Sequence, residues 1–176
     1  MLSKEFIVSF LNQADAESLS EMMVNNQENF KRYFPITLSK NKSVADSLKF
    51  IEEKSKQILD KTEFTFIIKD NLSSKVAGII IIKEINWEIK QGEFAYCISS
   101  EFENKGWMSK AIGLTSKYGF EVLGFENFQI IVHKLNYPSV KVALKNCFVW
   151  QRTLINEYTP PNEAALDMEL YELKSK

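Results

Sequence analysis

A chain of 176 residues is long enough to bury a sizeable core, and we expect one domain spanning residues 1–176. With 45% hydrophobic and 26% charged residues, its composition is that of an ordinary globular protein. Lysine and arginine number 22 against 23 aspartates and glutamates, so the chain has no global basic field to hold nucleic acid. The composition thus argues against nucleic-acid binding as a main function.

Apolar and cysteine patterns exclude further classes of protein. The longest aliphatic run, Ile79 to Ile82, is far shorter than the roughly 20 residues that a membrane span needs, and the amino terminus lacks signal-peptide features. We therefore expect a cytoplasmic protein that does not bind membranes. Cys97 and Cys147 form no Cys-x-x-Cys pair, so we expect both to be small buried hydrophobes in a reducing compartment.

The first sixty residues predict one strand and two helical segments. Residues 6–10 alternate as a strand, and Asp15 is the expected cap of a helical segment that Pro35 closes. Ser43-Val44-Ala45-Asp46 resembles a capping box and opens a second helix. The face of that helix predicted to be buried carries Val44, Leu48, Ile51, Ser55 and Ile58.

A hairpin, a strand and a long helix follow. Residues 63–69 and 76–86 are predicted strands joined by a turn, and residues 93–99 form a third strand. A helix is predicted over residues 108–122, ended by Gly124. Its expected buried positions are Met108, Ala111, Ile112, Thr115, Tyr118, Gly119 and Val122.

The carboxyl-terminal part predicts a strand, a short helix and two further strands. The strands cover residues 127–133, 148–158 and 165–172, and the helix begins at Asn136 and runs through Lys145 with Pro138 in its first turn. The complete order, β-α-α-β-β-β-α-β-α-β-β, indicates a mixed sheet with helices on its faces, an α/β fold.

Residues 103–111 lie at the junction between a predicted strand and the long helix. Gly106 stands there among polar residues. Amides at a helix start lack intrahelical partners and carry the positive end of the dipole, so such a turn suits a phosphate. A single glycine also serves any tight turn, and both interpretations stay open on spacing alone.

Several motifs taken in order resemble the GNAT superfamily of acyl-CoA N-acyltransferases, most closely its RimJ/RimL-like branch. The similarity covers nearly the whole chain. It rests on Phe34-Pro35, Val76-Ala77-Gly78-Ile79, Gly92-Glu93-Phe94-Ala95-Tyr96, Lys105 to Ala111, Asn136-x-x-Ser139-x-x-Val142-Ala143-x-Lys145-x-x-Phe148, and Asp167-x-x-x-Tyr171. This resemblance implies a central sheet of about seven strands, splayed in the middle and flanked by about four helices.

The resemblance implies acetyl-CoA as the cofactor, with its pyrophosphate wrapped by the loop before the long helix. The implied cofactor-binding residues are Cys97, Ile98, Ser99, Asn104, Lys105, Gly106, Trp107, Met108, Ser109 and Asn136. Glu103 departs from the family pattern, which has a neutral amide or a cation there. An inward carboxylate would repel phosphate, whereas one turned to solvent would cost little.

The resemblance also implies the catalytic residues. Glu93 is the candidate general base, acting directly or through water, and its other interpretation is an outward-facing strand residue. Ser139 is the candidate general acid beside the thioester sulfur. On local pattern alone, Asn136 and Ser139 read equally as helix-start residues. His133, the single histidine, flanks the site or is structural, and we expect no metal.

The implied activity is transfer of acetyl from acetyl-CoA to a primary amine by direct attack, without a covalent enzyme intermediate. The acceptor is a protein N-terminus or a small amine such as a polyamine or an antibiotic. A non-catalytic acyl-CoA-binding module is the alternative, motivated by departures from the family pattern at Glu103, Cys147 and Arg152. Many relatives form dimers, and the apolar segment 148–158 permits a homodimer here.

Overall fold

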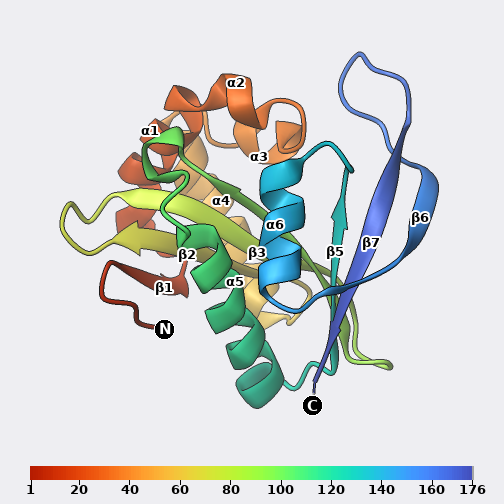
Figure 1. Ribbon diagram of the computed structural model, residues 1–176. Helices are drawn as coiled ribbons and strands as arrows, with labels where there is room; N and C mark the ends of the chain where they lie inside the picture. Colours follow the sequence, from red (N-terminus) through yellow and green to blue (C-terminus); the bar gives the residue numbers. More distant parts are fainter. Residues whose placement is uncertain (176) are drawn as a thin grey trace. The chain divides into compact units, whose positions relative to one another are not determined.

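The computed structural model describes residues 1–175, and within them seven strands hydrogen-bond in the order β1-β2-β3-β4-β5-β7-β6 (Figure 1). β4 and β5 are parallel and β1–β2, β5–β7 and β6–β7 are antiparallel, so the predicted mixed sheet is confirmed. The strands are β1 (Phe6–Phe10), β2 (Phe64–Asp70), β3 (Val76–Asn86), β4 (Gln91–Ile98), β5 (Asn127–Val132), β6 (Val149–Tyr158) and β7 (Leu166–Lys174).

Four longer helices and several short helical turns flank these strands in the described part of the chain. The longer helices are α1 (Ala16–Asn25), α4 (Val44–Leu59), α5 (Trp107–Tyr118) and α6 (Tyr137–Lys145). The short turns are η1 (Gln13–Asp15), α2 (Gln27–Phe30), α3 (Pro35–Ser39), η2 (Ser100–Phe102) and η3 (Gly119–Leu123). Each predicted strand ends within two residues of its observed bounds.

The chain divides into two units. Unit 1 comprises Met1–Ile81 and Tyr96–Trp107, and unit 2 comprises Ile82–Ala95 and the segment from Met108 onward. Strands β3 and β4 therefore each contribute residues to both units. In unit 1, apolar side chains of α1, α4 and the strands are fully buried, including Phe6, Leu19, Met23, Ile51, Phe66 and Ile79. Each such side chain stabilises the fold by about 1.5–3 kcal/mol relative to exposure.

Helix α4 begins as predicted but buries a different face. Ser43 Oγ accepts the Asp46 N–H at 3.2 Å, which confirms the N-terminal cap. The buried positions are Ser47, Phe50, Ile51 and Lys54. Val44 and Leu48 are 45% and 42% exposed, so the predicted face was wrong at these two positions, whereas Ile51 is buried and Ser55 and Ile58 are half-buried. The prediction missed buried polar side chains that have partners, as shown by Lys54 Nζ at 2.6 Å from Glu63 Oε1.

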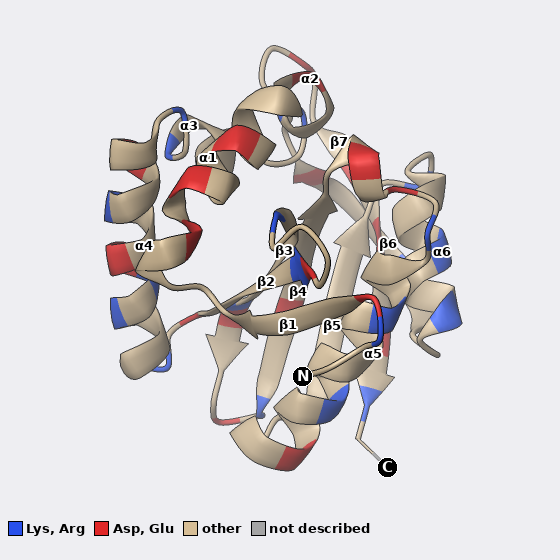
Figure 2. Ribbon diagram, turned by 90° about the vertical axis from the view of Figure 1, so that its left-hand side faces the viewer, with Lys and Arg blue, Asp and Glu red and all other residues tan. Residues whose placement is uncertain are grey.

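The helical segment before α4 also departs from its prediction at both ends. Asn12, rather than Asp15, provides the first side-chain cap, and the buried Asp15 carboxylate pairs with Lys69. Pro35 was expected to close the segment but begins α3. Proline is tolerated at a helix start because its missing N–H would have no intrahelical partner there. The charged residues of α1 and α4 appear as coloured bands in Figure 2.

In unit 2, the predicted long helix ends in a π-helical turn. α5 stops at Tyr118, η3 follows, and Gly124 ends the segment as predicted with φ +83°. Val122 was expected to be buried and is 62% exposed. A π-helical turn contains more residues than an α-helical turn, so positions after Gly119 rotate away from the face that the α-helical spacing predicts.

The parallel pairing of β4 with β5 is short. It runs from Gln91↔Asn127 to Phe94↔Ile130 and stops there, although β4 continues to Ile98 and β5 to Val132. The parallel ladder therefore ends four residues before β4 does. This ending is the splay expected in the middle of the sheet, and it leaves a strand edge on which further hydrogen bonds can be made.

Cys147 ends α6 in a left-handed conformation. The N–H of Phe148 donates to the Ala143 carbonyl at 3.1 Å and that of Cys147 to Leu144 at 3.2 Å, which is a Schellman motif. Cys147 has φ +62° and is exposed, so the prediction that it is buried was wrong, whereas Cys97 is buried as expected. The motif requires a left-handed residue beyond the helix end, and this position lies at the surface.

Replacing Cys147 with glycine is expected to stabilise the fold by about 0.5–1 kcal/mol. A non-glycine residue pays about 1–2 kcal/mol in this conformation, partly offset by the greater unfolded-state entropy of glycine. Thermal or urea unfolding measures the change. Cys147→Ala serves as the control, since it removes the thiol but keeps the Cβ. Equal stabilisation by both variants would assign the gain to loss of the thiol instead.

Candidate functional site

The loop between η2 and α5 presents backbone amides. Asn104 and Gly106 have φ values of +59° and +74°. A Cβ added at Gly106 would meet no atom within 4 Å, so the backbone there is open on that side. The amides of residues 104–107 have no acceptor among the described residues, and α5 begins at Trp107. Four free amides at the start of a 12-residue helix fit an anion such as a pyrophosphate.

Around this loop, the side chains of Trp107 and Met108 are buried, and that of Lys105 is exposed and carries a positive charge. Trp107 is buried, with ring centroids 5.0 Å from Phe102 and 5.2 Å from Phe6. Met108 is buried as well, so both predicted cofactor residues can offer only their backbone. The exposed Lys105 has Nζ 4.8 Å from the centroid of the Phe102 ring. Its position over a fixed aromatic ring keeps a positive charge beside the free amides.

Glu103, the departure from the family pattern, is exposed. Glu103→Gln is therefore expected to change acetyl-CoA affinity by less than about twofold, because a solvated carboxylate is screened within a Debye length of about 8 Å. Isothermal titration at two salt concentrations measures this. Substantially tighter binding by Glu103→Gln would contradict the solvent-facing position.

The end of β4 carries three predicted cofactor residues in unit 1. Cys97 is buried, and its burial raises the pKa of the thiol to about 12, so it is neutral and not a nucleophile. Gly78 of β3 is required beside it, since a Cβ there would lie 2.6 Å from the Cys97 carbonyl oxygen. Ile98 is half-buried and Ser99 is buried. The local arrangement favours backbone rather than side-chain recognition at this strand edge.

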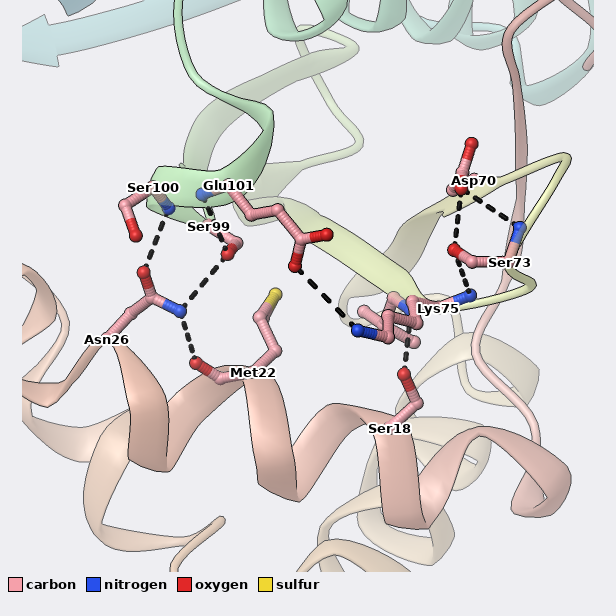
Figure 3. Close-up of polar contacts among 10 residues, drawn as sticks. Ser18, Met22, Asn26, Asp70, Ser73, Lys75, Ser99, Ser100 and Glu101 are labelled. Atoms are coloured by element: carbon pink, nitrogen blue, oxygen red, sulfur yellow. Dashed lines mark hydrogen bonds and ion pairs between the residues drawn. The ribbon is translucent and has the colours of Figure 1, made fainter.

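Ser99 also has a partner that sequence reasoning missed. Asn26, at the end of α1, donates from Nδ2 to Ser99 Oγ at 3.2 Å and accepts the Ser100 N–H at 2.9 Å (Figure 3). The Asn25-Asn26 pair was a signal for a helix end. No local pattern could have indicated its partners, which lie 73 and 74 residues away.

Glu93, the candidate base, lies on β4 in unit 2 and forms an ion pair. Its Oε1 is 2.7 Å from Lys83 Nζ, and the two side chains are 15% and 36% exposed. Burial raises the pKa of Glu93, and Lys83 opposes this change. A partly buried carboxylate with a raised pKa is compatible with the predicted general base, and its ion pair with Lys83 is equally compatible with a structural strand residue. Lys83 was not anticipated, although it lies on the predicted strand that precedes the strand of Glu93.

Asn136 and Ser139 lie together at the start of α6, in unit 2. Asn136 Oδ1 accepts the Ser139 N–H at 3.3 Å, so the helix-start interpretation is observed. This contact is made by the backbone N–H of Ser139. His133 is buried, and its Nδ1 accepts the Leu135 N–H at 3.3 Å, which indicates a structural role.

The described residues were also compared with the requirements of a metal site and of a membrane-spanning helix. Within residues 1–175, no group of three or more His, Cys, Asp or Glu is placed to hold a metal ion. None of the helices in that range is long and apolar enough to cross a membrane. At Arg152, a departure from the family pattern, β6 has a register shift relative to β7 between Trp150 and Arg152. This departure therefore falls at an irregularity of the strand pairing.

The family described as acetyltransferase (GNAT) domain matches residues 6–149, most of the chain. The chain belongs to the GNAT acetyltransferase family. Spermidine N(1)-acetyltransferase of Escherichia coli is 31% identical to this GNAT chain over 103 residues, which are 58% of the chain and 54% of that relative. The match thus spans about half the length of that protein.

Solved structures of GNAT proteins share the fold across nearly the whole chain. A ribosomal-protein-S5-alanine acetyltransferase from Vibrio fischeri has a TM-score of 0.91 at 18% identity, covering 99% of this chain and 95% of the other. The microcin C7 self-immunity acetyltransferase MccE, in complex with acetyl-CoA and AMP, has a TM-score of 0.86 at 22% identity, with 98% and 94% covered. The predicted fold is therefore confirmed.

Proposed function

We propose that this protein transfers an acetyl group from acetyl-CoA to a primary amine. The observation that carries the proposal is the open set of amides at residues 104–107 in a chain that belongs to the GNAT family. The proposed reaction is direct attack in a ternary complex. The buried, neutral thiol of Cys97 agrees with a mechanism that forms no covalent intermediate with that residue.

The loop and the strand edge suit the two ends of the coenzyme. The amides of residues 104–107 would hold the pyrophosphate with Lys105 beside them, and the backbone at Cys97 and Ile98 would hold the pantetheine amides, next to Ser99, whose own N–H donates to the Ala77 carbonyl at 2.8 Å. The remaining predicted cofactor residues, Met108, Ser109 and Asn136, would contribute as the family resemblance implies. Bound acetyl-CoA supplies the activated acetyl thioester.

Two side chains are proposed to move protons. Glu93 takes a proton from the acceptor amine, directly or through water, and its raised pKa suits that task. Ser139 Oγ donates a proton to the leaving sulfur, as the family resemblance implies for this position at the start of α6. Lys83 opposes the effect of burial on the pKa of Glu93.

The acceptor is proposed to be a small polyamine or a protein N-terminus. Relatedness to a spermidine acetyltransferase supports the first, and the fold shared with a ribosomal-protein acetyltransferase supports the second. A free α-amino group, with an ordinary pKa near 8, loses its proton more readily than an alkyl amine near 10.4. A polyamine acceptor would therefore depend more on Glu93 than an N-terminal acceptor does.

We further propose a cytoplasmic location and a homodimer. Exposed apolar side chains on β6, at the end of the strand order, support pairing of two copies: Val149, Trp150 and Ile155. Light scattering after gel filtration tests the oligomeric state separately from activity.

Release of free CoA from acetyl-CoA, followed with a thiol reagent, tests the proposed function. The panel contains spermidine, peptides with different N-termini and an aminoglycoside, and N-terminally blocked peptides serve as controls. We expect release that depends on an added amine, with the acetylated amine identified by mass spectrometry. Thermal stabilisation by acetyl-CoA without amine-dependent release would support the non-catalytic module instead.

A further inference from the structure

Asn26 joins helix α1 to the turn after β4. The side chain is 4% exposed and lies within unit 1. Nδ2 donates to the Met22 carbonyl at 2.8 Å and to Ser99 Oγ at 3.2 Å, and Oδ1 accepts the Ser100 N–H at 2.9 Å. The buried side-chain amide of Asn26 therefore hydrogen-bonds both to α1 and to a turn more than 70 residues further along the chain (Figure 3).

The turn that Asn26 holds leads directly into the candidate pyrophosphate loop. Ser99 and Ser100 precede Phe102, whose ring stacks on Trp107 at 5.0 Å. The loop at residues 103–106 therefore lies between the turn that is hydrogen-bonded to Asn26 and the stacked rings of Phe102 and Trp107. Displacement of the turn would change the direction of the amides at residues 104–107.

A pocket of about 130 Å³ borders this junction, lined by residues that include Ser18, Met22, Asn26, Lys75, Ser99 and Ser100. Such a space gives the turn room to move, in contrast to a close-packed interior. Asn26 Oδ1 accepts the Ser100 N–H, while the preceding Ser99 N–H donates to the Ala77 carbonyl at 2.8 Å, so Asn26 holds the part of the turn that leads into the loop.

We propose that Asn26 is a positioning residue for coenzyme binding, acting through the turn at Ser99 and Ser100. The inference rests on the proposed function, because it assumes that acetyl-CoA binds to the loop at residues 104–107. Asn26 does not itself touch the coenzyme. Asn26 orders the loop before acetyl-CoA binds. The free energy of binding is then not reduced by the entropy cost of ordering the loop.

Asn41 provides a matched control within the same unit. It is also fully buried, and its Nδ2 donates to the carbonyl four residues earlier, at Thr37, at 2.8 Å. Its Oδ1 accepts from Ser47 Oγ at 2.7 Å, so its second contact is with α4 and not with the turn after β4. Asn26→Ala and Asn41→Ala therefore remove the same kind of buried amide with different partners.

The test measures hydrogen exchange and acetyl-CoA affinity for both variants, at a temperature where unfolding curves show each to be folded. Without ligand, Asn26→Ala should speed exchange at the Ser100 amide about tenfold or more, and Asn41→Ala should not. Titration calorimetry should give acetyl-CoA binding about tenfold weaker for Asn26→Ala and within twofold of wild type for Asn41→Ala.

Three results would overturn the inference. Unchanged affinity in Asn26→Ala would remove Asn26 from coenzyme binding while leaving the proposed function intact. If both variants bound acetyl-CoA equally more weakly than wild type, the weakening would be explained by a general loss of stability. No acetyl-CoA binding by wild type would defeat the proposed function and this inference together, and the ligand-free exchange data would still report whether Asn26 holds the turn.

Discussion

Ser139→Ala is expected to lower kcat about 100-fold to 10,000-fold, the range typical of a lost general acid, while acetyl-CoA affinity changes less than about threefold. The reason is that alanine retains the backbone N–H that Asn136 Oδ1 accepts at 3.3 Å, so the start of α6 is unchanged. Steady-state kinetics with saturating amine gives kcat, and calorimetry gives the dissociation constant.

Tyr137→Phe is the matched control for Ser139→Ala. Tyr137 lies on the same turn of α6, carries a hydroxyl and is 68% exposed, so its substitution should leave kcat unchanged. If Ser139→Ala weakened acetyl-CoA binding as much as it lowered turnover, the hydroxyl would serve binding and not proton donation. A kcat loss in Tyr137→Phe with none in Ser139→Ala would transfer the role to tyrosine.

Glu93→Gln is expected to lower kcat/KM about 100-fold with a polyamine acceptor and to abolish the acidic limb of its pH profile. Burial raises the pKa of Glu93, with Glu84 and Glu157 acting in the same direction and Lys83 opposing. The carboxylate is the active base, so wild-type activity should fall as the pH drops through this raised pKa, above the range of an ordinary glutamate. A pH series of kcat/KM measures the limb.

Lys83→Met separates the base from the ion pair. Removing the cation, 2.7 Å from Glu93, leaves burial unopposed, so the pKa of Glu93 should rise further and the acidic limb should move to higher pH. Activity at alkaline pH should stay near the wild-type value. If Glu93→Gln retained full turnover and an intact acidic limb, Glu93 would be a structural partner of Lys83 only.

The order of strands and helices was predictable because local signals act over a few residues. Ser43 and Gly124 begin and end their helices as their chemistry requires. The errors arose where tertiary contacts override local pattern. On α4, the partnered Lys54 is buried while Val44 and Leu48, expected to be buried, are exposed, and the π-helical turn exposed Val122. Neither a salt bridge partner nor a change of helix type is visible in hydrophobic spacing.

The candidate site was predictable from the sequence only where residues follow one another along the chain. The loop around Gly106 and the pair Asn136 and Ser139 are contiguous, and both have the local geometry expected of them. The contacts of Lys83 with Glu93 and of Asn26 with Ser99 join separate strands and helices. Such partners depend on the assembled fold, so a single sequence without its structure does not identify them.

The central claim is that the loop before α5 holds acetyl-CoA, and calorimetric titration with acetyl-CoA tests it most directly. Gly106 and Gly124 both have positive φ and open space at the Cβ position, so alanine imposes similar strain at each. We expect one-to-one binding by wild type, about tenfold weaker binding by Gly106→Ala, and wild-type binding by Gly124→Ala. No binding by wild type at millimolar acetyl-CoA, or equal affinity for all three proteins, would contradict the claim.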